Sequence, residues 1–212
     1  AEDHRLRRSV RLAAAIALVD CTDPEATGPA AAEHIMCADR LVLTKTDIAD
    51  REDVTRIAAT LRWQNPRAPQ LDAAGELDPL RLFNAGLIDA VTGEPDPERW
   101  LAYTRTHADS NAVISRSYEG GVEDWPDLSR RIATMQRAAG QGFLRLKGLV
   151  HTADDDRPLV VQAVREQVFR PVRLPAWPGE PRTRIVAIAR ADVAPALDRF
   201  GQGFAPHPVH DH

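Results

Sequence analysis

The chain has 212 residues, of which 43% are hydrophobic and 27% are charged, a balance typical of a globular protein and not of a disordered one. Its net charge of −4, with no basic half, argues against a nucleic-acid partner. The longest apolar stretch, Leu12 to Val19, is far too short to span a membrane, and the N-terminus lacks a signal-peptide layout. We therefore expect a cytoplasmic protein with no membrane partner.

Strand and helix signals alternate in the first third of the chain. Short apolar runs predict buried parallel strands, and helical spacing predicts the connections between them. We predict strands at Ala13–Val19, Arg40–Leu43 and Ala68–Leu71, with helices at Ala30–Ala38 and from Asp50 to Asn65. Asp50 is the expected N-cap, and Pro66 opposes helix at the residue before it. This βαβαβ pattern indicates a parallel α/β sheet, which we interpret as the C-terminal part of a P-loop-type domain over residues 1–95.

A stretch rich in Pro, Gly, Asp and Glu follows, and we predict a linker over residues 96–108. The pattern then changes to that of an α+β domain over residues 109–200: a mostly antiparallel sheet with helices on one face. The expected strands are Ala112–Tyr118, Phe143–Val150, Leu159–Val164, Val168–Leu174 and Arg184–Ala189, and the expected helices are Trp125–Ala139 and Val193–Phe200. Asp154 to Pro158 is expected to turn the Phe143 and Leu159 strands. Residues 201–212 form a His-containing tail.

The strongest chemical motif is the run Leu41 to Asp47 (LVLTKTD). In GTP-binding proteins a buried strand ends in Asn-Lys-x-Asp. The Asp carboxylate accepts hydrogen bonds from the N1 and N2 donors of guanine, a donor pair that adenine lacks. The Lys stem covers the base while its ammonium stays near water. Thr44, Lys45 and Asp47 are therefore candidate guanine-binding residues, with no catalytic residue among them.

Two observations qualify this motif. Thr44 stands where Asn is usual, and its single hydroxyl cannot replace an amide, so Asp47 carries most of the expected base selectivity. Thr-Lys-x-Asp is also a common solvated turn between a strand and a helix, and this alternative stays open on the tetrapeptide alone.

The surrounding sequence resembles the CobW-type family of GTPases and metallochaperones, which includes the cobalamin-synthesis protein CobW. In that family a helix with an Ala-Asp ending, here Ala38-Asp39, leads into the guanine motif. Asn-Pro-x-Ala, here Asn65 to Ala68, ends the next helix. The second half is more specific. The stretches that resemble the family's C-terminal domain are Gly142–Leu149, Arg157–Val164, Leu174–Pro178 and Arg184–Arg190.

The resemblance implies part of a GTP-dependent chaperone or insertase that delivers zinc or cobalt to a client metalloprotein, with GTP and Mg²⁺ as cofactors of the intact protein. The family's Gly-x-x-x-x-Gly-Lys-[Ser/Thr] phosphate loop and its Cys-x-Cys-Cys metal motif are not found in this sequence. We therefore expect weak or no GTP binding and no hydrolysis by this chain alone. The alternative function is a non-catalytic protein-interaction or metal-buffering module.

The chain begins at Ala1 within a charged helical stretch, so we expect a fragment or a processed product. A partial α/β layer would leave an open sheet edge. The expected partners are therefore a missing N-terminal GTPase portion or further copies of the chain, in addition to the client.

Other residues carry open alternatives. Asp20 either faces the nucleotide or caps a turn, and the turn is the more common role. His34 and Cys37 have helical metal-ligand spacing, but a core role is more frequent for the cysteine. His207, His210 and His212 are candidate metal ligands, since imidazoles suit zinc or cobalt; the alternative is a plain terminus.

Three residues of the second half also have two interpretations. Arg145 and Lys147 lie on one face of a predicted strand, and they either meet an acidic surface or belong to a solvated face. Trp177 is expected to pack as a rigid corner between two prolines rather than to anchor a partner.

Overall fold

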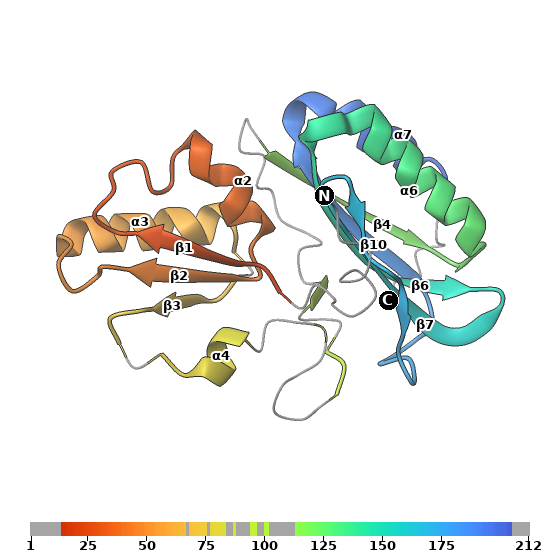
Figure 1. The fold of residues 1–212 in the computed structure, drawn as a ribbon, viewed down its shortest axis with the longest axis horizontal. Helices are drawn as coiled ribbons and strands as arrows, with labels where there is room; N and C mark the ends of the chain where they lie inside the picture. Colours follow the sequence, from red (N-terminus) through yellow and green to blue (C-terminus); the bar gives the residue numbers. More distant parts are fainter. Residues whose placement is uncertain are drawn as a thin grey trace, which may run out of the picture. The chain divides into compact units, whose positions relative to one another are not determined.

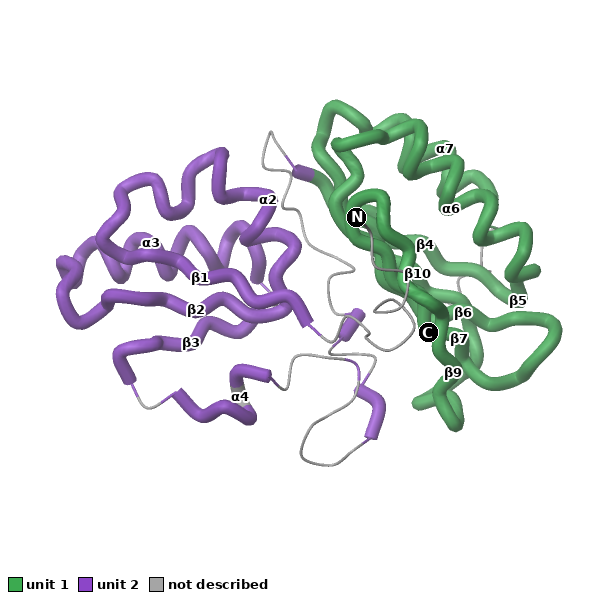
Figure 2. Tube along the Cα trace, in the orientation of Figure 1, with its two compact units in different colours: residues 1–12, 114–212 green, residues 13–113 purple. Residues whose placement is uncertain are grey.

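The described residues form two compact units that follow one another in the sequence, and the boundary between them falls between Val113 and Ile114 (Figure 2). We call residues 14–113 the N-terminal unit and residues 114–204 the C-terminal unit. The computed structural model describes residues 14–66, 68–75, 77–83, 87, 94–96, 100–101 and 113–204.

The N-terminal unit contains a three-stranded parallel sheet in the order β1-β2-β3 (Figure 1). The expected α/β layer is confirmed. Its elements are β1 Ile16–Asp20, α2 Pro29–Cys37, β2 Arg40–Thr44, α3 Arg51–Gln64, β3 Gln70–Asp72 and the short α4 Pro79–Phe83. β1 and β2 pair in register, from Ile16 opposite Arg40 to Asp20 opposite Thr44.

Local sequence explains both helix ends of α3. The Asp50 carboxylate accepts a hydrogen bond from the Glu52 N–H at 2.9 Å, which is an N-cap. At the other end Asn65 is only 1% exposed. Its amide nitrogen donates to the carbonyls of Ile35 and Ala38, so one side chain ties the ends of α2 and α3 together.

Helices α2 and α3 cover the same face of this sheet. Alternate strand residues share one apolar cluster with both helices, as expected for right-handed crossovers between parallel strands. The buried members are Val19, Cys21, Ile35, Ala38, Leu41, Leu43, Ile57, Leu61 and Ala68. Leu18, on the opposite face of β1, is 73% exposed.

The C-terminal unit contains a seven-stranded sheet whose main path runs β4-β10-β6-β7-β8, with β5 beside β6 and β9 beside β7. The pairings β10·β6, β6·β7, β7·β8 and β7·β9 are antiparallel, whereas β5 pairs with β6 in parallel. The strands are β4 Val113–Gly120, β5 Val122–Glu123, β6 Phe143–Thr152, β7 Asp155–Val164, β8 Gln167–Val168, β9 Val172–Arg173 and β10 Thr183–Arg190.

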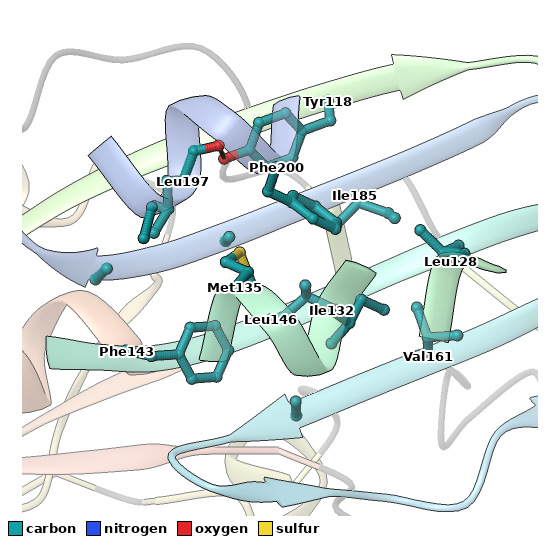
Figure 3. Packing of buried hydrophobic residues seen from close by; sticks show 14 of the residues in the cluster. Tyr118, Leu128, Ile132, Met135, Phe143, Leu146, Val161, Ile185, Leu197 and Phe200 are labelled. Atoms are coloured by element: carbon teal, nitrogen blue, oxygen red, sulfur yellow. Dashed lines mark hydrogen bonds between the residues drawn. The ribbon is translucent and has the colours of Figure 1, made fainter. Parts of the chain in front are cut away.

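Two helices, α6 Trp125–Ala139 and α7 Ala194–Gly201, lie side by side on one face of this sheet (Figure 1). The Asp124 carboxylate caps α6 through the Asp127 N–H, and Gly140 ends it at φ 52°, a left-handed conformation that favours glycine. Leu128, Ile132 and Met135 of α6 pack on the strands together with Leu197 and Phe200 of α7 (Figure 3). The expected α+β layer is confirmed.

The structure corrects the sequence prediction at three places. The Val168–Leu174 strand is two short strands, β8 and β9, because Pro171 has no N–H to donate between them. The turn before β7 is tighter than the acidic run suggests, since β7 already begins at Asp155. The last helix begins at Ala194, after a 3₁₀ turn at Ala191–Val193.

The interpretation that Arg145 and Lys147 belong to a solvated face of β6 is also wrong. Arg145 and Lys147 are only 2% and 5% exposed, so both cations are covered rather than solvated. In the same unit Trp177 is half-buried, its indole N–H donates to the Asp156 carbonyl, and its ring lies 5.5 Å from that of His151. Trp177 therefore packs as the expected corner.

Candidate functional site

The three parallel strands of the N-terminal unit end at one edge of their sheet and bring polar side chains together there (Figure 1). Asp20 ends β1 directly opposite Thr44 of β2, and Leu43 of β2 lies opposite Asp72, the last residue of β3. In open α/β sheets, ligands bind outside the carboxyl ends of the strands. This edge is therefore the candidate functional site of the unit.

The loop after β2 is held at its start by its own strand neighbours. The Thr44 hydroxyl donates to the Val19 carbonyl at 3.2 Å, and the Thr44 carbonyl accepts from the Cys21 N–H at 3.0 Å. Thr44 therefore ties β2 to β1 and has a structural role, whatever else it contacts.

Lys45 adopts φ 59°, a left-handed conformation that is uncommon for a residue with a Cβ atom. Its carbonyl accepts hydrogen bonds from the N–H groups of Ile48 and Ala49, at 3.3 and 2.9 Å, which closes the loop into a tight turn before α3. A backbone of this kind costs about 1–3 kcal/mol unless its surroundings fix it, and such residues cluster at functional sites.

Asp20 and Lys45 form an ion pair across the strand ends, with 2.6 Å between the carboxylate and the ammonium nitrogen. Asp20 also accepts hydrogen bonds from the N–H and the hydroxyl of Thr22, at 2.9 and 2.6 Å. The hydrogen bonds from Lys45 and then from Thr22 lower the pKa of Asp20 to about 2, and Asp20 in turn raises the pKa of Lys45. Asp20 therefore caps a turn and also pairs with the lysine of the motif.

The hydroxyl of Thr46 contacts the Asp72 carboxylate, which also accepts from the Ala74 N–H. The loop after β2 is thus fixed to β1 through Lys45 and to β3 through Thr46. Beside it lies Cys21, a buried thiol whose pKa is raised by burial and then by the Asp20 and Asp72 carboxylates.

Asp47 differs from the other carboxylates of this edge. It is exposed, and within the described part of the chain its side chain makes no hydrogen bond or ion pair. Its neighbour Ile48 is 71% exposed, and the Lys45 side chain is 52% exposed. An unpaired carboxylate beside apolar and aliphatic surface suits a planar ligand that offers two hydrogen-bond donors on one edge.

Sequence reasoning identified Thr44, Lys45 and Asp47 but missed Asp72 and the pairing of Asp20 with Lys45. The available signal was that the first and third predicted parallel strands are each followed directly by an aspartate, Asp20 and Asp72, and that the second is followed by the motif ending in Asp47. Carboxyl ends of neighbouring parallel strands share one edge, so these residues were candidates for one cluster.

The candidate metal ligands have a different outcome. His207, His210 and His212 lie outside the described residues. Among the residues that the structure describes, no group of three or more His, Cys, Asp or Glu side chains could hold a metal ion. His34 is exposed and Cys37 half-buried, and both cysteines are free thiols.

Among the helices of the described residues, none has the length and apolar character needed to cross a membrane.

A parallel α/β layer with a polar loop at its strand ends, followed by an antiparallel sheet under two helices, defines the chain as a two-part α/β and α+β protein. Residues 1–72 match the family described as CobW/HypB/UreG, nucleotide-binding domain. Residues 119–200 match the Cobalamin synthesis protein cobW C-terminal domain. The two matches occur in this order and together span well over half of the chain, which belongs to the CobW family.

Solved structures share this fold. The crystal structure of Zn(II)-bound YjiA GTPase from E. coli has a TM-score of 0.60 and 23% identity, covering 93% of this chain and 64% of that one. A Zn(II)-bound triple mutant of YjiA GTPase has a TM-score of 0.59 and 22% identity, covering 92% and 65%. This chain thus spans just under two thirds of the length of these structures. No curated protein sequence matches it.

Proposed function

We propose that this chain supplies guanine recognition to a GTP-dependent metal chaperone of the CobW type. The observation that carries the proposal is the loop after β2, where Asp47 is exposed and unpaired within the described residues while Lys45 is held beside it. The match of residues 1–72 to a nucleotide-binding domain supports this role.

The chemistry assigns a separate task to each residue. The Asp47 carboxylate accepts hydrogen bonds from N1 and N2 of guanine. The Lys45 stem covers a face of the base while its ammonium remains with Asp20. Thr44 positions the loop through Val19 rather than contacting the base. In this proposal the loop is held in place by Asp20, Lys45 and Thr46, and the guanine base is bound by Asp47.

The test uses nucleoside monophosphates, so that base selectivity is measured with little help from phosphate contacts. In NMR titrations we expect GMP to bind more tightly than AMP. In Asp47→Asn the amide can accept from N1 of xanthine and donate to its O2, so preference should shift from GMP to XMP by about tenfold or more. Asp53→Asn, an exposed change on α3, is the matched control.

Equal binding of GMP and AMP by the unaltered chain would contradict the proposal. So would an Asp47→Asn variant that still prefers GMP. Asp53→Asn must keep the selectivity of the unaltered chain, because it removes the same charge away from the loop.

We further propose that the metal cargo is zinc or cobalt and that His207, His210 and His212 collect it. Imidazole nitrogens suit both ions, and solved YjiA structures are described as Zn(II)-bound. Zinc and cobalt titrations should show binding by the full chain that is lost on deleting residues 206–212. Unchanged affinity after the deletion would rule out this role for the tail. Metal binding without any GMP selectivity would instead favour the non-catalytic metal-buffering module.

A further inference from the structure

A groove of about 310 Å³ lies between α6 and α7 in the C-terminal unit. Its floor is apolar and consists of Met135, Ala196 and Phe200, all buried against the sheet (Figure 3 labels Met135 and Phe200). Thr134 and Ala138 line its side and are exposed to solvent. The groove is therefore open and has an apolar base, but it is small for a drug-sized molecule.

Two arginines at this groove are available to a ligand. The Arg130 side chain is 75% exposed and, among the described residues, is paired only with Asp127, one turn earlier, at 3.1 Å. Such an exposed pair contributes little, so a ligand carboxylate can replace it at small cost. Arg199 of α7 is exposed and makes no hydrogen bond or ion pair within the described residues.

A third arginine is fixed in place. Arg131 bonds to Glu123, lies 3.1 Å from Asp127, and has its guanidinium 4.9 Å from the Phe204 ring centre. One of its nitrogens, Nη1, is buried without a hydrogen-bond partner. Because Nη1 is buried, Arg131 contributes positive charge to the lining of the groove rather than a contact with a ligand.

The local charge contrasts with that of the whole chain. The chain carries a net charge of −4. The two helices nevertheless carry four arginines against two aspartates; these residues are Arg130, Arg131, Arg137, Arg199, Asp127 and Asp198. This charge favours an acidic partner over a basic one.

The dimensions favour a peptide over a single small anion. The lining residues of α6 extend from Asp127 to Ala138, which is about 17 Å along a helix, or about five residues of extended chain. We propose that the α6–α7 groove binds a short acidic peptide segment of a partner protein, with one apolar side chain over Met135 and Phe200 and carboxylates at Arg130 and Arg199. This inference does not depend on nucleotide binding.

The test is fluorescence anisotropy with the full chain and a fluorescein-labelled peptide in which a leucine lies between two pairs of acidic residues. We expect saturable binding that weakens with added salt. Arg199→Glu places a like charge at the contact and should weaken binding by about tenfold or more. Ala138→Glu, on the opposite helix, should act in the same direction. A peptide with glycine in place of leucine should bind several-fold more weakly.

Arg170→Glu is the matched control, because Arg170 is exposed and unpaired within the described residues but lies between β8 and β9. It must leave affinity unchanged; equal weakening by Arg170→Glu and Arg199→Glu would overturn the proposal in favour of diffuse charge attraction. Displacement of the peptide by equimolar inorganic phosphate would assign the groove to a free anion instead. Tighter, Arg199-dependent binding of an oligothymidylate would assign it to nucleic acid. Circular dichroism checks that each variant is folded.

Discussion

At the scale of single residues, the loop after β2 depends on a lysine whose backbone and side chain are both constrained. Lys45 has φ 59°, and its ammonium lies 2.6 Å from Asp20. Asp20 is itself held by Thr22, so the ion pair has one fixed partner. We infer that Asp20 offsets part of the conformational cost at Lys45 and keeps the lysine stem in place.

Asp20 should titrate with a pKa of about 2, below its ordinary value of 3.8. Because folding lowers this pKa, the carboxylate's contribution to stability is complete above about pH 4 and is lost as the pH falls toward 2. Lys45→Gln should raise the Asp20 pKa, measured by NMR of the side-chain carboxyl carbon. The two Thr22 hydrogen bonds should hold it slightly below 3.8.

The matched control for this titration is Arg56→Gln, which removes an exposed cation paired with Asp53 on α3. It should not move the Asp20 midpoint. An Asp20 pKa that stays near 2 in Lys45→Gln would show that Thr22 alone causes the shift and that the ion pair is not formed in solution.

Sequence patterns predicted the loop because its signal is local: a short apolar strand followed by Thr44, Lys45 and Asp47. They could not predict the Lys45–Asp20 pair, since it depends on which strands are neighbours and on their register. The burial of Arg145 and Lys147 was missed for a related reason. Alternation along one strand shows that two residues share a face, but it does not show what covers that face.

At the scale of elements, the C-terminal sheet depends on a close approach between β6 and its neighbours. A Cβ atom at Gly148 would lie 2.7 Å from Cγ1 of Ile185 and 2.9 Å from the Arg184 carbonyl oxygen. Gly148→Ala should therefore destabilise the chain by about 1–3 kcal/mol in urea unfolding, because a backbone neighbour cannot move aside. Gly179→Ala, where nothing lies within 4 Å, is the control and should be nearly neutral. Equal effects would contradict this account.

Helices were easier to predict than strands. α6 has an apolar residue every three or four positions, an Asp cap and a terminal Gly, so its Trp125–Ala139 bounds follow from sequence alone. The strand order β4-β10-β6-β7 could not be predicted from the sequence, because no local pattern shows that β4 pairs with a strand much later in the chain. Pro171 divides one predicted strand into two, and its position in the sequence already indicated a break there.

At the scale of the whole molecule, the described residues of the two units form separate apolar cores with no member in common. Leu61 in α3 and Leu128 in α6 are each 0% exposed, one in each core. Leu61→Ala and Leu128→Ala should each cost about 2–5 kcal/mol. In hydrogen exchange followed by mass spectrometry, each variant should reduce protection in its own unit only. Loss of protection in both units from either variant would mean that they unfold as one.

The pairing of β4 with β10 also affects how the protein is made. The three strands that the structure describes in the N-terminal unit have all been synthesised once the chain reaches Asp72. In contrast, β4 ends at Gly120 and its partner β10 begins at Thr183, a delay of roughly 3–13 s at typical translation rates. During that delay Ile114 and Tyr118, which are buried in the finished domain, have no sheet to join. The nascent chain therefore presents an apolar strand to chaperones before its partner leaves the ribosome.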